Sequence, residues 1–117
     1  MAAKILLINE STEECANIQE ILNDFDVLVA NNASDAVKKL TTDEEIELVL
    51  IDLALTNSEA FRIIAEIKKN ELNKKIRIVI LTQNEQIGEE ARALRCGAGD
   101  YVRKPFSPAG LRARLHV

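Results

Sequence analysis

The sequence predicts an α/β domain in which helices cover both faces of a parallel β-sheet. Short apolar runs of strand length alternate along the chain with longer stretches whose apolar residues have helical spacing. Several runs, such as residues 4–8 and 48–51, are almost continuously apolar, which is typical of parallel strands buried on both faces. Alternation of this kind implies strand–helix–strand units with right-handed crossovers.

The five predicted strands are short and begin close to the first residues of the chain. They cover residues 4–8, 27–30, 48–52, 76–81 and 101–102. The run that ends at Asp52 is the clearest, whereas Arg77 interrupts the apolar character of the fourth. The length of 117 residues suits one domain with a single core.

Five helices are expected between and after these strands. Ser11 and Glu14 have the spacing of a capping box, and Ser34–Asp35 is the expected start of the second helix. The third begins at residues 57–59, the fourth ends at Gly97, and the last opens at Ser107–Pro108. The expected buried stripes are, in chain order, Cys15, Ile18, Ile21, Leu22 and Phe25; Ala33, Val37 and Leu40; Phe61, Ile64, Ala65 and Ile67; and Ala91 with Leu94.

The composition excludes several classes of function. Fifteen basic and 19 acidic residues give a net charge of −4, and aromatic residues make up only 3%, so nucleic-acid binding by this domain is not expected. Cys15 and Cys96 are too few for a disulfide scaffold, and a single histidine, His116, next to the C-terminus argues against histidine-based catalysis. No apolar run approaches the roughly 20 residues of a membrane span, and the thiols without an export signal indicate a cytoplasmic location.

Polar residues stand where the predicted strands end. Asn9 and Glu10 follow the first strand, Asp52 ends the third, Thr82 follows the fourth and Lys104 follows the fifth. The carboxyl ends of parallel strands meet at one edge of a sheet, so we expect these side chains to converge. Carboxylates suit Mg²⁺, a hydroxyl and an ammonium suit phosphoryl oxygens, and a carboxylate can itself attack phosphorus.

Four blocks of sequence resemble the receiver domain of two-component response regulators, and together they span almost the whole chain. They are Lys4-Ile-Leu-Leu-Ile-Asn-Glu10, Leu48-Val-Leu-Ile-Asp52, Ile78-Val-Ile-Leu-Thr82 and Gly97-Ala-Gly-Asp-Tyr101-Val-Arg-Lys104-Pro105-Phe106. The resemblance implies a flavodoxin-like (CheY-like) sheet with strand order 2-1-3-4-5. It also implies a signalling domain rather than an enzyme, in which Asp52 accepts a phosphoryl group from a histidine kinase or a phosphotransfer protein.

The same resemblance assigns roles to the other residues at the strand ends. It implies that Mg²⁺ is bound by Glu10, Asp52 and the backbone carbonyl of Ala54, with Asn9 as a further position of the metal site. It implies that Thr82 and Lys104 contact the phosphoryl oxygens.

The final block carries two further expectations from the family. Tyr101 is the expected aromatic switch residue, which moves together with Thr82. The peptide bond between Lys104 and Pro105 is expected to be cis.

Four positions depart from the family pattern. Asn9 removes a negative charge, and Glu10 is one methylene longer than the usual aspartate. Thr56 replaces a common proline, and Gln83 stands where a small residue is usual. These departures motivate a second hypothesis, a degenerate receiver that binds a partner without phosphorylation. A flavin or corrinoid module on the same fold is a third, disfavoured by the absence of a glycine-rich phosphate loop and of an internal histidine.

Residues 1–117 are expected to form one receiver domain that belongs to a longer protein, because the chain ends early for a helix that starts near Ser107. An output domain or a downstream protein would then receive the signal, and a homodimer through the face of the last helix stays open. No contact with nucleic acid or membrane is expected of this domain.

Overall fold

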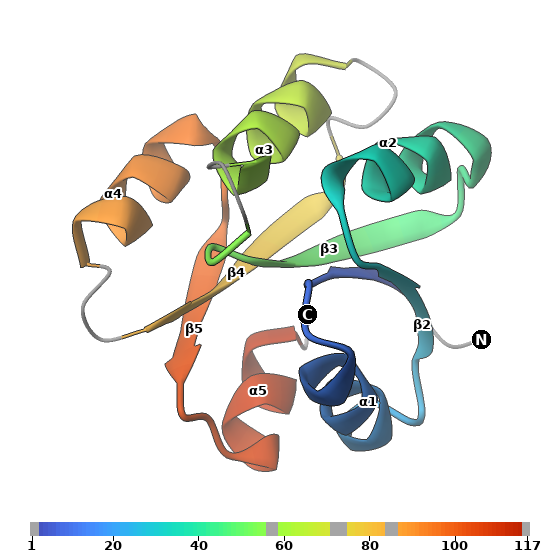
Figure 1. Ribbon diagram of the computed structural model, residues 1–117, viewed down its shortest axis with the longest axis vertical. Helices are drawn as coiled ribbons and strands as arrows, with labels where there is room; N and C mark the ends of the chain where they lie inside the picture. The colour runs from blue at the N-terminus through green and yellow to red at the C-terminus, as the bar shows by residue number, and fades with distance from the viewer. Residues whose placement is uncertain (1–2, 56–58, 71–74, 84–86, 116–117) are drawn as a thin grey trace.

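A computed structural model describes residues 3–55, 59–70, 75–83 and 87–115, and these residues form the predicted α/β fold. Five strands make one sheet in the order β2-β1-β3-β4-β5, and every neighbouring pair is parallel (Figure 1). The strands are β1 (Lys4–Ile8), β2 (Asp26–Ala30), β3 (Ile46–Asp52), β4 (Arg77–Gln83) and β5 (Asp100–Lys104). The predicted strand order is confirmed.

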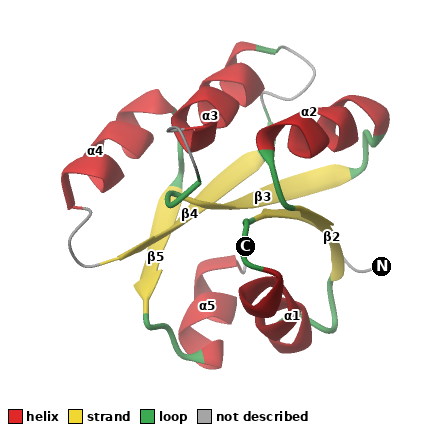
Figure 2. Ribbon diagram, in the orientation of Figure 1, coloured by secondary structure: helices red, strands yellow, loops and turns green. Residues whose placement is uncertain are grey.

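Five helices cover the two faces of the sheet (Figures 1 and 2). They are α1 (Thr12–Ile21), α2 (Ala33–Thr42), α3 (Glu59–Lys69), α4 (Ile87–Cys96) and α5 (Pro108–Leu115). In the view of Figure 1, α1 and α5 lie below the sheet and α2, α3 and α4 above it. Successive strand residues therefore enter different cores: Leu6 and Ile8 pack on the α2–α4 side, and Ile5 and Leu7 on the α1/α5 side.

The parallel register brings the ends of the strands to one edge of the sheet. Ile8 pairs with Ala30 and with Ile51, so the segments after β1 and β3 begin side by side. Asp52 pairs with Leu81 of β4, one residue before Thr82. The side chains that the sequence places after different strands thus start from neighbouring positions, as the topology requires.

Two helix starts show how local polar groups set the boundaries. The hydroxyl of Ser11 accepts a hydrogen bond from the backbone N–H of Glu14 (3.1 Å), as the capping-box pattern predicts. The second helix begins earlier than predicted, because the side chain of Asn32 caps it by accepting from the N–H of Asp35 (2.8 Å). The predicted start of the third helix at residues 57–58 lies outside the described residues.

Three of the predicted apolar stripes were partly wrong. The exposed members are Val37, Ala65, Ala91 and Leu94. The buried residues of these helices include Ala36, Ile63 and Ala93, which the prediction left out. Each omitted residue is one or two positions from an exposed one. The errors are this small because the tilt of a helix against the sheet decides which side of a broad apolar stripe is buried.

Arg77, which interrupts the apolar pattern of β4, has a structural role at the opposite edge of the sheet. Its guanidinium donates hydrogen bonds to the carbonyl oxygens of Arg114 (2.8 Å) and Leu115 (3.3 Å). These carbonyls lie in the last turn of α5, where helical oxygens lack partners and a cation is favourable. None of the helices in the described part of the chain has the length and apolar character needed to cross a membrane.

Gly97 and Gly88 give a matched test of this backbone. Gly97 ends α4 with φ of +126°, and a Cβ there would lie 2.5 Å from Cγ of Lys68, whereas a Cβ on Gly88 would meet nothing within 4 Å. We expect Gly97→Ala to lower the free energy of unfolding by about 1–3 kcal/mol. We expect Gly88→Ala, in the first turn of α4, to raise it by a few tenths of a kcal/mol and by no more than about 1 kcal/mol. Urea unfolding measures both, and equal effects of the two substitutions would contradict this account.

Candidate functional site

A pocket of about 250 Å³ lies at the carboxyl edge of the sheet. Its lining residues are Asn9, Glu10, Ser11, Glu14, Asp52, Ala54, Leu55 and Lys104. Five of the residues singled out from the sequence are therefore brought together here, from the ends of β1, β3 and β5. Thr82 is not part of the lining.

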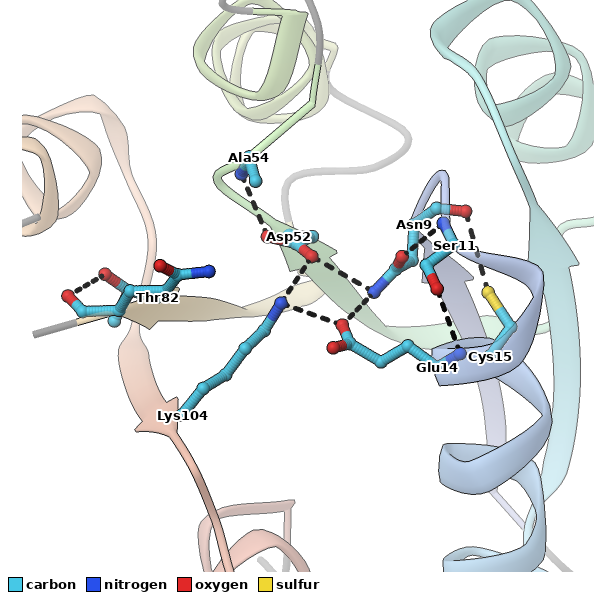
Figure 3. Close-up of polar contacts among 9 residues, drawn as sticks. Asn9, Ser11, Glu14, Cys15, Asp52, Ala54, Thr82 and Lys104 are labelled. Atoms are coloured by element: carbon cyan, nitrogen blue, oxygen red, sulfur yellow. Dashed lines mark hydrogen bonds and ion pairs between the residues drawn. The ribbon is translucent and has the colours of Figure 1, made fainter.

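Asp52 lies at the end of β3 and is only 5% exposed. Its Oδ1 accepts a hydrogen bond from the backbone N–H of Ala54 (2.9 Å). Its Oδ2 accepts from Nζ of Lys104 (2.7 Å) and from Nδ2 of Asn9 (3.1 Å; Figure 3). A buried carboxylate is costly unless it is paired and hydrogen-bonded, and these three donors meet that requirement.

Lys104 connects two carboxylates across the pocket. Its ammonium lies 2.7 Å from Oδ2 of Asp52 and 2.8 Å from Oε1 of Glu14, and Figure 3 shows the side chain extended toward both. Burial by itself lowers the pKa of Lys104, but the hydrogen bonds to Asp52 and Glu14 outweigh it, so the pKa lies above its usual value. Lys104 therefore stays charged at neutral pH.

Glu14 is a member of the site that the sequence analysis missed. It belongs to the first turn of α1, and its carboxylate accepts hydrogen bonds from Lys104 and from Asn9. Burial raises the pKa of Glu14, but these hydrogen bonds outweigh that effect and place the pKa below its usual value. The signal in the sequence was ambiguous, because a glutamate three residues after Ser11 is also the mark of a capping box.

Asn9 presents its amide nitrogen to the pocket rather than its oxygen. Its Oδ1 accepts from the backbone N–H of Ser11 (2.8 Å), which leaves Nδ2 to donate to Asp52 and Glu14. Its backbone carbonyl accepts from the side chain of Asn31 (3.0 Å). In this arrangement Asn9 offers hydrogen-bond donors, and not an oxygen ligand, to whatever enters the pocket.

The donor set fits Mg²⁺ in one particular way. No three His, Cys, Asp or Glu side chains in the described parts of the chain gather closely enough to hold a metal ion. Mg²⁺ in proteins is commonly held by one or two carboxylates with water in its remaining positions. Asp52, with Glu10 or Glu14 on the same pocket wall, meets that lower requirement, and the pocket has room for bound water.

Thr82 belongs to a second polar cluster, between β4, β5 and α4. It is fully buried, and its hydroxyl bonds to the carbonyl oxygen of Gln83 (3.3 Å; Figure 3). Nearby, the guanidinium of Arg103 donates two hydrogen bonds to Glu90 of α4 (2.9 and 3.0 Å) and lies 5.1 Å from the ring centre of half-buried Tyr101. The hydrogen bonds from Arg103 hold the pKa of Glu90 below its usual value; burial opposes them, and a hydrogen bond from Thr82 assists.

The remaining family-specific positions have different outcomes. The peptide bond between Lys104 and Pro105 is cis, as expected. Gln83 is exposed at the end of β4, so its side chain does not fill the pocket. Thr56 lies outside the described residues.

Comparison with known proteins identifies relatives of the same kind over the whole chain. The family model of the response regulator receiver domain matches residues 5–116. The phosphate regulon transcriptional regulatory protein PhoB of Escherichia coli is 31% identical over 121 residues, which cover 98% of this chain and 51% of that protein. The transcriptional regulatory protein KdpE of Staphylococcus aureus is 30% identical over 119 residues, which cover 100% of this chain and 50% of that protein. The chain thus spans about half the length of these curated relatives.

Solved structures agree with the family match. A response regulator receiver domain protein from Clostridium thermocellum superposes with a TM-score of 0.85 at 26% identity, covering 95% of this chain and 89% of that one. The chemotaxis response regulator CheY4 of Vibrio cholerae, at 20% identity, has the same fold with a TM-score of 0.89, covering 98% of this chain and 97% of that one. The chain therefore belongs to the family of response regulator receiver domains.

Proposed function

We propose that this receiver domain takes a phosphoryl group onto Asp52 from the phosphohistidine of a histidine kinase or phosphotransfer protein. The observation that carries the proposal is the placement of the Asp52 carboxylate, which is buried at the pocket wall and bridged by Lys104. A carboxylate held in one position, beside a fixed cation, is prepared for attack on phosphorus. The domain acts as a signalling domain in this proposal.

In the proposed transfer, a carboxylate oxygen of Asp52 forms a bond to phosphorus while the bond from phosphorus to the donor imidazole nitrogen breaks. The electron pair of that bond stays with the imidazole. Lys104 holds its ammonium beside Asp52, where negative charge spreads over the phosphoryl oxygens. Bound Mg²⁺, held by Asp52 with Glu10 and the Ala54 carbonyl as the expected further ligands, would neutralise part of the same charge.

The second cluster supports a proposal about switching. The hydroxyl of Thr82 has two alternative acceptors within its own cluster, the carbonyl oxygen of Gln83 and the carboxylate of Glu90, and Arg103 covers the ring of Tyr101. A phosphoryl group on Asp52 would offer Thr82 new acceptor oxygens and so favour a second arrangement of this cluster. The readout would be the face formed by α4, β5 and α5.

The partners proposed for this domain follow from its relatives. PhoB and KdpE are named as transcriptional regulators and are about twice as long as this chain, so we propose that the output lies in a separate domain or a downstream protein. Contact with DNA is not assigned to this domain, whose net charge is −4. The cytoplasmic location and the homodimer through α5 stay predictions.

Asp52→Asn should abolish phosphorylation without unfolding the domain, because the two side chains have the same shape. Wild type incubated with a small acyl phosphate and Mg²⁺ should gain the mass of one phosphoryl group in intact mass spectrometry, and Asp52→Asn should gain none. Asp26→Asn, at an exposed position of β2, is the control and should behave as wild type. A gain by Asp52→Asn would mean another acceptor, and no gain by wild type would favour the phosphorylation-independent binding module.

Lys104→Ala should slow phosphorylation by about tenfold or more, because the phosphoryl oxygens lose a charge-assisted partner. It should leave the affinity for Mg²⁺ unchanged or higher, since a cation next to the metal position is removed. Stopped-flow phosphorylation and calorimetric Mg²⁺ titration measure the two effects, with exposed Lys75→Ala as the control for loss of charge. A wild-type phosphorylation rate in Lys104→Ala would contradict the assignment.

Glu90→Gln should destabilise the domain by about 1–2 kcal/mol at pH 7, because the Arg103 guanidinium loses its anionic partner. The pKa of folded Glu90 is lowered, so its contribution to stability is complete above the unfolded pKa and is lost as pH falls through the folded pKa. The difference between wild type and Glu90→Gln should therefore shrink when urea unfolding is repeated at acidic pH. A difference that is independent of pH would refute this, and exposed Glu20→Gln serves as the control.

A further inference from the structure

Glu14 satisfies only half of the capping box that its position suggests. Its backbone N–H bonds to the hydroxyl of Ser11 (3.1 Å), which caps α1. In a complete box the glutamate side chain would accept from the N–H of Ser11. Here that N–H donates to Oδ1 of Asn9 instead (2.8 Å), so the carboxylate of Glu14 is not used by the cap.

The carboxylate of Glu14, which takes no part in the helix cap, faces the pocket. Its Oε1 accepts from Lys104 and from Nδ2 of Asn9, and both of these donors also bond to Oδ2 of Asp52. Figure 3 shows the ammonium and the amide nitrogen lying between the two carboxylates. Glu14 is thus held in the same hydrogen-bonded ring as Asp52, although the two residues come from α1 and β3.

The neutral amide of Asn9 and the charged carboxylate of Glu14 complement each other in this ring. Glu14 and Asp52 contribute two negative charges and Lys104 one positive charge, while the amide of Asn9 is neutral. An aspartate at position 9 with a neutral residue at position 14 would give this group of side chains the same net charge. With Glu14 present, the amide of Asn9 has two N–H groups to give, one to each carboxylate, and it lowers their mutual repulsion.

We propose that Glu14 carries the negative charge that Asn9 lacks, and that it sets both the affinity of the pocket for Mg²⁺ and the position of Lys104 beside Asp52. The part of this inference that concerns Mg²⁺ rests on the proposed function of the pocket. The part that concerns Asn9, Glu14 and Lys104 rests on the hydrogen bonds alone and needs no metal.

The test compares wild type, Glu14→Gln, Asn9→Asp and the double variant, with Glu13→Gln as control. Glu13 is exposed in the same first turn of α1, so its substitution removes the same charge from the helix start. Calorimetric titration with Mg²⁺ should show about tenfold weaker binding for Glu14→Gln, and near wild-type binding for Glu13→Gln and for the double variant. Equal affinity of Glu14→Gln and Glu13→Gln would overturn the inference, as would a failure of Asn9→Asp to restore binding.

A second readout uses the same proteins without metal. Asn9→Asp should lower the melting temperature when Glu14 is present, because three carboxylates then surround one ammonium. The same substitution should have little effect in the Glu14→Gln background, so the two changes are not additive. Additive changes in melting temperature would overturn the coupling between Asn9 and Glu14.

Phosphorylation measured on the same batches separates the two proposals. If wild type is not phosphorylated on Asp52 but the Mg²⁺ affinities and melting temperatures follow the pattern above, the proposed function fails and the role of Glu14 stands. If wild type is phosphorylated and Glu14→Gln behaves as Glu13→Gln in both titration and melting, the role of Glu14 fails and the proposed function stands.

Discussion

The pocket depends on one interaction, the ion pair between the ammonium of Lys104 and the carboxylate of Asp52. The two residues end β5 and β3, and the whole of β4 lies between these strands, so only a long side chain can make the connection. Asp52 is almost completely buried, and its charge would be costly there without a cation. By also bonding to Glu14, the same ammonium joins α1 to the edge of the sheet.

Arginines in the last third of the chain have a similar connecting role elsewhere. Two of them hold elements together. Arg103 joins β5 to α4 through Glu90, and Arg112 joins α5 to the end of α1 through Asp24 (2.6 and 2.7 Å). The Arg103 pair is the one that bears on the proposed switch, because it borders both Thr82 and Tyr101.

Much of the fold was predictable because it follows from local patterns. A continuously apolar run such as Leu48–Ile51 is typical of a strand in the middle of a parallel sheet, where both faces are buried. The order of strands and helices along the chain then limits the topology to a few arrangements. The exposed side chains of Val37 and Leu94 were predicted wrongly, since the choice between adjacent helical positions depends on how each helix is tilted against the sheet. Four residues of the pocket, Asn9, Glu10, Asp52 and Lys104, were predictable for the same reason as the strands, because each one ends a strand or follows its end.

The sequence by itself determined the parallel α/β class and the edge of the sheet where Asp52 and Lys104 meet, while the resemblance to receiver domains supplied the strand order. Only the tertiary structure decided which atoms these side chains present to each other. The amide of Asn9 turns its nitrogen inward because the N–H of Ser11 occupies its oxygen. Because the N–H of Ser11 bonds to Asn9, the carboxylate of Glu14 is available to bond to Lys104. Which atoms pair in the pocket depends on competition among donors and acceptors that lie within a few ångströms of one another. The spacing of residues along the chain does not reveal the result of that competition.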